Sequence, residues 1–510
     1  MKVYFVKKSI PDGLAFGIGC GLVLMVAILL RLPTLASRSL WLDETYSAWF
    51  SALSIAELWT KVPLYETHPP MFYSLLKGWR LVFGASEAGL RSLSLVASAL
   101  TVLLVACTGR LLRLSKNTDP IFFLAALFLA FNAGSVEYAQ QARPYAIETL
   151  AAYITIISSI GLITNLIIRD PANRPVNTKA CFTPLVLAGA LTMWSHNTGM
   201  FILFGIWSGM ITVILLFSGE NTFKKLKIVA YAGILVIILW MPFFPMFLRQ
   251  NAGMSSMTYW ITFHMGDIWK AAELVSGGRR SIMILAVFGA IGIYGLWRWN
   301  RAVALHIVTL LLLPFLVSVI YSMAIKPLFV PRLFVWMTPV MMVLVATGLA
   351  TAISNSGVRS IIAIGILGLS FTYVLNYYNR ETENWRGLIE SIAKDTRDGD
   401  IIIALPNEIN MPLAYYGAGK KLPQVLYLPG PFPALALTRS YVGNLGAPVF
   451  DKDDLRLIAE AEKNNNRIIL FLRHPEVYDQ AGLVDTHLSM SRKVTKVSRS
   501  LSVSVSTYEH

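Results

Sequence analysis

Long apolar segments recur along most of this chain, and short polar gaps separate them. Most of the segments reach the roughly 18 to 20 apolar residues that cross a bilayer as a helix. The chain is therefore expected to be an α-helical polytopic membrane protein with about eleven transmembrane helices. The expected spans are 12–33, 89–112, 120–135, 145–168, 183–197, 199–218, 227–247, 280–297, 303–323, 333–352 and 359–379.

From about residue 380 the pattern changes to that of a soluble α/β domain. The stretch "NWRGLIESIAKDTRDGDIIIALP" predicts an amphipathic helix, an Asp-Gly turn and a buried strand, and "DDLRLIAEAEKNNNRIILFLRHP" repeats that order. The alternating "LSVSVSTY" predicts a last strand. We expect a transmembrane domain over 1–379, with interfacial helices at about 39–85, and a small α/β domain over 380–510.

Composition and charge agree with a membrane protein. Hydrophobic residues make up 55% of the chain and charged residues only 14%, which excludes an ordinary soluble protein of this length. The net charge is +15, but the Lys and Arg residues stand between apolar segments instead of forming one patch. This arrangement favours positive-inside topology over nucleic-acid binding, so no nucleic-acid partner is expected.

The basic residues also predict which gaps share a side of the membrane. They concentrate in every second gap, which should therefore be cytoplasmic. The other gaps, at 34–88, 136–144, around 198, 248–279 and 324–332, should be extracytoplasmic together with the C-terminal domain. The cytoplasmic gaps carry Lys2, Lys7, Lys8, Arg110, Arg113, Lys116, Arg169, Arg174, Lys179, Lys224, Lys225, Lys227, Arg298, Arg301 and Arg359.

The first exterior gap contains an acidic pair, Asp43 and Glu44, in "SLWLDETYSAWFSAL". The aromatic residues that follow recur at helical spacing, which predicts a helix on the membrane surface with its aromatic side among the lipid headgroups. Two roles stay open for Asp43: it caps this helix, or it faces a cleft as a general base. Further along, "HPP" predicts a helix start that leaves His68 exposed.

Two later exterior gaps bring polar groups to membrane depth, which is costly unless they line a wet or ligand-filled cavity. One of these gaps, "AIKPLFVPRLF", contains Lys326 and Arg332, and the other contains Arg143. All three are cations on the side of the membrane where positive charge is scarce. Cations in such a place are commonly used to hold a phosphate. For Arg143, snorkelling to lipid phosphate is the alternative. The other gap, "NAGSVEYAQQARPYAIETL", contains Glu137, Tyr138, Gln141, Arg143 and Tyr145.

The order of these motifs ("DE", then "HPP", then "AQQARPYA", then "KPLFVPR") resembles the GT-C glycosyltransferases of the protein-mannosyltransferase and aminoarabinose-transferase type, a family-39-like group. The likeness covers about residues 10–350. It implies a GT-C fold in a bacterial inner membrane. It also implies transfer of a sugar from a polyprenyl-phosphate donor on the outer side, usually with inversion.

By this resemblance, Asp43 is the catalytic carboxylate, with Glu44 orienting it or binding the sugar. Arg143, Lys326 and Arg332 would bind the donor phosphate. His68, Glu137, Tyr138, Gln141 and Tyr145 would bind substrate, although relatives have Gln-Glu where this chain has Gln140-Gln141, and the aminoarabinose transferases have Lys in place of His68. No cofactor and no metal ligand are expected, while a divalent metal stays open.

The expected partners are the lipid-linked donor, membrane lipids and an acceptor that is a glycolipid, a polysaccharide or a protein. A transporter or flippase of lipid-linked sugars is the rival function. It would place charges near the bilayer midplane and show repeat symmetry. The acids of this chain cluster at the predicted outer face instead.

Overall fold

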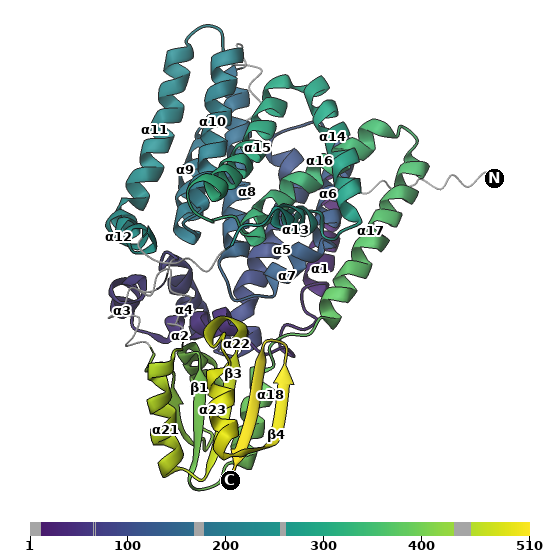
Figure 1. Ribbon diagram of the computed structural model, residues 1–510. Coiled ribbons are helices and arrows are strands. Elements are labelled where there is room, and N and C mark those ends of the chain that lie inside the picture. The colour runs from purple at the N-terminus through teal and green to yellow at the C-terminus, as the bar shows by residue number, and fades with distance from the viewer. Residues whose placement is uncertain (1–11, 65, 67, 168–177, 256–261, 433–449) are drawn as a thin grey trace, which may run out of the picture.

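Long apolar helices form one part of the molecule, and a small sheet with its own helices lies at one end of them (Figure 1). This computed structural model describes residues 12–64, 66, 68–167, 178–255, 262–432 and 450–510. The basic residues predicted before position 12, and Arg169 and Arg174, lie outside the described residues.

In the described part of the chain, nine helical segments are long and apolar enough to cross a membrane, or ten if the bent pair of α6 and α7 forms one span. A helix lies at each of the eleven predicted positions, but the count of eleven spans is not confirmed. The helix α9 is not among the nine, since polar residues, including Lys179 and Ser195, occupy its ends.

The helices of this part follow one another along the chain with short connections. Their bounds are α1 (Asp12–Leu29), α5 (Glu87–Leu111), η2 (Lys116–Thr118), α6 (Asp119–Ala130), α7 (Ala133–Ala139), α8 (Tyr145–Ile167), α9 (Thr178–Ser195), α10 (Gly199–Phe217), α11 (Thr222–Trp240), η4 (Met241–Phe243), α12 (Phe244–Ser255), α13 (Met265–Ser276), α14 (Ser281–Trp299), α15 (Arg301–Ala324), η5 (Pro331–Met337), α16 (Thr338–Ala352) and α17 (Ser356–Asn379).

Small residues let neighbouring spans approach closely. A Cβ added to Gly292 of α14 would lie 2.0 Å from the carbonyl oxygen of Leu344, and one added to Gly348 of α16 would lie 1.8 Å from that of Phe288. Such close contact replaces the hydrophobic driving force that is missing between helices in lipid. Glycine is therefore required at both positions.

The predicted exterior gaps gather at the end of the bundle that bears the sheet (Figure 1). Arg143 of one gap contacts Asp43 of another, the ring of His68 packs on that of His196, and Gln250 donates a hydrogen bond to the carbonyl of Pro63. The turn between α10 and α11, which carries a predicted cytoplasmic cluster, lies at the far end. These gaps and the α10–α11 turn therefore lie at opposite ends of the bundle, as the predicted alternation requires of them.

Short helices lie between the spans and the sheet: α2 (Leu42–Ala52), α3 (Ile55–Thr60), η1 (Val62–Leu64) and α4 (Met71–Phe83). The residue at the N-cap of α2 is Trp41, so the interpretation of Asp43 as the cap is wrong. The expected lipid-facing aromatic side of α2 is also wrong. Tyr46 and Phe50 are buried in protein, with the Phe50 ring 4.8 Å from that of Tyr73.

The C-terminal part is a five-stranded mixed sheet in the order β2-β1-β3-β5-β4. β1 pairs in parallel with β2 and β3, and β5 runs antiparallel to β3 and β4. The two predicted helix-strand units and the last strand are present. The elements are α18 (Trp385–Asp395), β1 (Asp400–Leu405), η6 (Asn407–Ile409), α19 (Asn410–Tyr416), β2 (Gln424–Tyr427), η7 (Lys452–Asp454), α21 (Leu455–Asn464), β3 (Arg467–Arg473), α22 (Pro475–Tyr478), α23 (Leu483–Ser491), β4 (Lys493–Ser500) and β5 (Val503–Glu509).

One hydrophobic core joins the sheet to the interfacial helices. Trp385, Ile402 and Phe471 of the C-terminal part belong to the same buried cluster as Phe50 of α2 and Leu76 of α4. Burial of apolar surface stabilises this contact. The sheet is therefore docked on the helix that carries the acidic pair.

A buried ion pair fixes the start of that helix. Glu44 is fully buried and accepts hydrogen bonds from Nε and Nη2 of Arg91 at 2.7 and 2.6 Å. Its oxygens also accept from the backbone N–H groups of Ala142 and Trp41 at 2.8 and 3.2 Å. Glu44 thereby connects α2, α5 and the loop between α7 and α8.

Replacing Arg91 by Met should destabilise the protein by about 3 to 5 kcal/mol, because Glu44 would be left as an unpaired buried charge. Thermal unfolding of the purified protein in detergent measures the effect. Arg113→Met, at an exposed arginine, is the control and should unfold like the wild type. Equal unfolding temperatures for the two variants would contradict the role of this ion pair.

Candidate functional site

The structure brings together Asp43 and Arg143, which are 100 residues apart in the chain. Nη2 of Arg143 lies 3.8 Å from Oδ2 of Asp43, and Nη1 donates to the Asp43 carbonyl oxygen at 3.2 Å. The Asp43 side chain is 29% exposed, whereas that of Arg143 is 4% exposed. The pair thus combines a buried cation with a carboxylate that a ligand can reach.

The neighbouring buried contacts explain why these two side chains meet. Glu44, next to Asp43, accepts a hydrogen bond from the backbone of Ala142, next to Arg143. This contact fixes the two backbones relative to each other. Snorkelling of Arg143 to lipid, the alternative considered from the sequence, is wrong because its side chain is buried.

Arg143 stays charged in this environment. Burial lowers its pKa, but Tyr73, Asp43, Tyr145 and Glu66 outweigh burial and raise the pKa overall. Its Nη1 also lies 3.5 Å from the hydroxyl of Tyr73, while Nε is buried without a hydrogen-bond partner among the described residues. A fixed positive charge with an unused donor favours a negatively charged neighbour.

A second carboxylate, Glu66, lies beside this pair. It binds Nδ1 of His68 and accepts a hydrogen bond from the His68 backbone at 3.1 Å. Burial raises the pKa of Glu66, but the charges of His68 and Arg143 outweigh burial and bring the pKa to about 2. The expectation that His68 is exposed is wrong, since its side chain is buried against Glu66.

An aromatic wall continues from His68. The His68 ring meets His196 edge to face at 4.6 Å, His196 lies 5.9 Å from Tyr145, and Tyr145 lies 5.1 Å from Tyr138. Burial, helped by nearby cations including Arg332, lowers the pKa of His196 well below its usual value. His196 therefore stands in the site as a neutral ring.

The two other predicted cations lie in the last exterior gap. Arg332, in η5, is within electrostatic range of Asp43, Tyr138 and Tyr145. Lys326 lies in the connection before η5, and its Nζ is buried.

Two predicted residues of the second exterior gap have different environments. Glu137 forms an ion pair with Arg380 at the start of the C-terminal part. Gln141 is half-buried. No observation tests the predicted substrate-binding roles of these two residues, so they stay predictions.

The two members of the acidic pair, Asp43 and Glu44, have different environments. Both oxygens of Glu44 are occupied by Arg91 and backbone donors inside the protein. Asp43 is the partly exposed member, and its neighbour across the site is Arg143. Of the two acids, Asp43 is therefore the one that can meet a substrate, and Glu44 can act through the position of α2.

No family model matches the chain, and no curated protein matches it in sequence. Solved structures do match. ArnT from Cupriavidus metallidurans in the apo state has a TM-score of 0.62 at 13% identity, and its structure bound to undecaprenyl phosphate has 0.60 at 13%; both matches cover 98% of each chain. The oligosaccharyltransferase of Archaeoglobus fulgidus, tethered with an acceptor peptide, has a TM-score of 0.53 at 12% identity, covering 91% of this chain and 70% of that one.

The chain has the GT-C fold. This confirms the fold class that the order of motifs implied. Because the ArnT match covers 98% of this chain, the shared GT-C architecture includes the C-terminal sheet as well as the spans.

Within this GT-C fold, the C-terminal sheet domain contributes two carboxylates that the sequence did not indicate. Oε2 of Glu383 accepts a hydrogen bond from the backbone N–H of Leu42 at 3.4 Å. Glu408 accepts from the hydroxyl of Tyr46 at 3.2 Å. Both contacts reach the helix of Asp43, and sequence patterns alone give no register between two domains.

Other residues of the site were missed although the sequence carried a signal. Arg91 stands inside a predicted apolar span, where an arginine needs a buried partner. Glu66 stands two residues before His68 in "YETHPP". Tyr73 follows the prolines of that motif by three residues and reaches Arg143.

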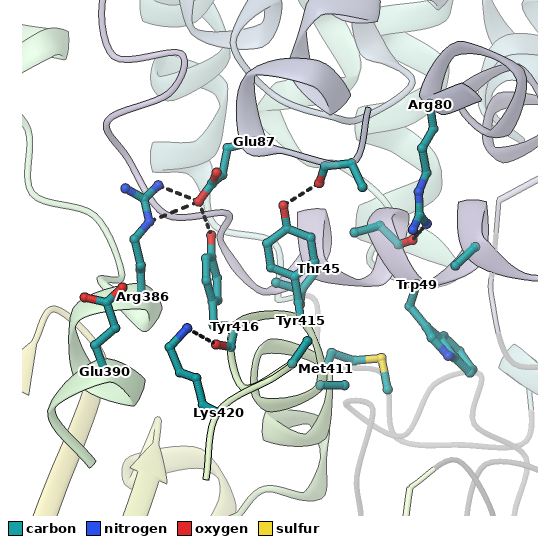
Figure 2. Close-up of a pocket in the computed structure, with 15 residues that line it drawn as sticks. Thr45, Trp49, Arg80, Glu87, Arg386, Glu390, Met411, Tyr415, Tyr416 and Lys420 are labelled. Atoms are coloured by element: carbon teal, nitrogen blue, oxygen red, sulfur yellow. Dashed lines mark hydrogen bonds and ion pairs between the residues drawn. The ribbon is translucent and has the colours of Figure 1, made fainter. Parts of the chain in front are cut away.

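A separate cleft of about 570 Å³ lies on a different face of α2 (Figure 2). One stripe of α2, including Thr45 and Trp49, lines it, together with Arg80 of α4 and Lys420 of the sheet domain. Asp43 is not among the lining residues. At its rim, Glu87 binds Arg386 and accepts from the hydroxyl of Tyr416 at 3.1 Å, which fastens the sheet domain to the helices.

Across the described ranges, no group of three or more His, Cys, Asp and Glu side chains is arranged to hold a metal ion. The expectation that the site works without a metal or another cofactor stays a prediction.

Glu408 should make stability depend on pH. Burial is the largest influence on this carboxyl and raises its pKa from 4.5 to about 7. A raised pKa means that the protonated form stabilises the fold, so this stability is present below about pH 4.5 and is lost as the pH rises through 7. By pH 8 the loss should approach about 3 kcal/mol.

Thermal unfolding of the wild type and of Glu408→Gln at pH 5.5 to 8.5 measures this effect. The Gln side chain has no charge to bury, so the variant should gain in stability over the wild type as the pH rises. A constant difference between the two proteins across this range would contradict the raised pKa.

Proposed function

We propose that this protein is an integral membrane glycosyltransferase. It moves a sugar from a polyprenyl-phosphate-linked donor to a hydroxyl or phosphate of a glycolipid, polysaccharide or protein. The reaction takes place on the outer side of the cytoplasmic membrane, where the C-terminal domain also lies, and inverts the anomeric centre.

The observation that carries this proposal is the reachable carboxylate of Asp43 beside the buried Arg143 and within electrostatic range of the half-buried Arg332, at one end of a GT-C bundle. The exterior gaps of the sequence supply all of these groups. A structure of ArnT with this fold is bound to undecaprenyl phosphate, which supports a lipid phosphate as the leaving group here. The positive-inside pattern supports the outer side.

The proposed step is a displacement at the anomeric carbon. Asp43 accepts the proton of an acceptor hydroxyl, whose oxygen forms the new bond to that carbon. The bond between the carbon and the phosphate oxygen breaks, and the electron pair stays on the phosphate. Guanidinium groups stabilise this growing charge most strongly in a site that excludes water.

The geometry suggests how the cations share this work. Inversion places the sugar between the base and the leaving phosphate, whereas Arg143 lies against Asp43. Arg143 therefore orients the Asp43 carboxylate, and its charge adds to the positive field around the phosphate. Arg332 and Lys326, which belong to the connection between α15 and α16, bind the phosphate on the far side of the sugar.

A transporter of lipid-linked sugars would use charges near the middle of the bilayer. In the described spans, every Asp, Glu, Lys and Arg lies within two turns of a helix end. This distribution favours the transferase. Formation of product by purified protein in detergent, from a polyprenyl-phosphate sugar and an acceptor lipid extract, decides between the two functions.

Asp43→Asn should lower the transfer rate by about 10² to 10⁴, since the amide accepts no proton. Initial rates with a radiolabelled polyprenyl-phosphate sugar measure the change. Asp398→Asn, at a side chain that is 98% exposed, is the control and should keep the wild-type rate. Wild-type transfer by a folded Asp43→Asn variant would end the assignment of Asp43 as the base.

Arg332→Gln should reduce kcat/KM for the donor by about 10² to 10³, the usual cost of losing one donor to a developing oxyanion. Arg332→Lys keeps the charge and should recover part of the loss. Arg279→Gln changes an exposed arginine at the same end and should have no effect. If Arg332→Gln matched that control, the phosphate would have to bind elsewhere.

A further inference from the structure

The helix that carries Asp43 is held at its start by the C-terminal domain. The N-cap residue Trp41 makes no side-chain cap hydrogen bond, so the first N–H groups of α2 depend on other partners. Glu44 accepts a hydrogen bond from the backbone N–H of Trp41. Glu383 of the sheet domain accepts one from the backbone N–H of Leu42 at 3.4 Å. Anions at a helix N-terminus are favourable, so Glu383 stabilises α2.

Glu383 is itself held within the sheet domain. It binds Nε of Arg473 at 2.8 Å, the hydroxyl of Ser502 at 2.7 Å and the indole N–H of Trp385 at 2.9 Å. Such a network leaves the carboxylate little freedom. The start of α2 is thus positioned by a rigid part of the other domain.

A second contact reaches α2 one turn further on. Glu408 lies in η6, just after β1, and is buried. Its Oε1 accepts a hydrogen bond from the hydroxyl of Tyr46 at 3.2 Å, and its Oε2 accepts from that of Tyr478 at 3.1 Å. Tyr46 follows Asp43 by three residues, so the two side chains share one side of α2.

A buried carboxylate at this position costs stability. A hydrophobic or neutral side chain of similar size at a buried position usually gives the fold equal or greater stability than a buried charge does. The groups facing Glu408 in the described part of the chain are Tyr46 and Asp43 of α2, Arg473 at the end of β3 and Tyr478 of α22. The contact with α2 therefore calls for a role in which the charge matters.

We propose that Glu408 is a positioning residue of the transfer reaction: through its hydrogen bond with Tyr46, the C-terminal domain fixes the orientation of Asp43. The proposal rests on the function proposed above, and it gives the C-terminal domain a part in catalysis. It also predicts a pH effect. Ionised Glu408 accepts charge-assisted hydrogen bonds from both phenols. Protonation makes the carboxyl a weaker acceptor, which loosens the contact with Tyr46 of α2.

Two tyrosine variants separate this role from general stability. Tyr46→Phe and Tyr478→Phe each delete one hydrogen bond to Glu408, but only the first crosses to α2. Tyr46→Phe should lower kcat by about ten- to a hundredfold, the size expected for a small misplacement of a catalytic group, with little change in the donor KM. Tyr478→Phe at pH 8 should keep the wild-type kcat.

The pH profile provides a second test that does not depend on the tyrosines. Wild-type kcat should fall as the pH drops through about 7, where Glu408 takes up its proton. Glu408→Gln resembles the protonated form, so it should lack this step. At pH 8 it should show the reduced kcat that the wild type reaches below the step.

The proposal is overturned if Tyr46→Phe and Tyr478→Phe have equal kcat values, or if Glu408→Gln keeps the wild-type pH profile. Should Tyr46→Phe fail to fold, the Glu408→Gln profile decides alone. Failure of the proposed function looks different: the wild type would form no product, or Asp43→Asn would be fully active. If Asp43→Asn is inactive but Tyr46→Phe and Tyr478→Phe have the same kcat, the proposed function stands and only the role of the C-terminal domain is refuted.

Discussion

The buried carboxylate of Glu44 is the contact on which the rest of the site depends. It joins Arg91 of α5, the start of α2 and the backbone of Ala142 in the next exterior loop. Pairing makes this buried charge tolerable, and its loss would leave an uncompensated ion. Because Asp43 and Arg143 are the chain neighbours of Glu44 and Ala142, this one contact sets the distance between a reachable carboxylate and a buried cation.

Each part of the molecule contributes different groups around that contact. The spans provide a rigid bundle with charges confined to the helix ends. The helix α2 provides Asp43, and the connection between η1 and α4 provides Glu66 and His68. The C-terminal sheet closes over α2 with Glu383 and Glu408. A helix held from both sides loses little conformational freedom when a substrate arrives, which is the main requirement for a positioned base.

The sequence predicts those features that depend on local patterns. Hydrophobicity gave the position of each span and the helix-strand order of the tail, and the scarcity of exterior cations pointed to Arg143 and Arg332. It could not predict contacts between distant segments: the burial of Tyr46 and Phe50, the ion pair of Glu44 with Arg91, or the docking of Glu408. The count of eleven spans is not confirmed, because the polar ends of α9 keep it out of the helices that are apolar enough to cross a membrane.

A structure of the protein with undecaprenyl phosphate would test the central claim most directly. The account predicts phosphate oxygens at hydrogen-bond distance, about 3 Å, from Arg332 or Lys326, with the Asp43 carboxylate facing the space where the sugar would be attached. A phosphate bound elsewhere, for example in the cleft lined by Trp49 and Lys420, with no lipid beside Asp43, would contradict it.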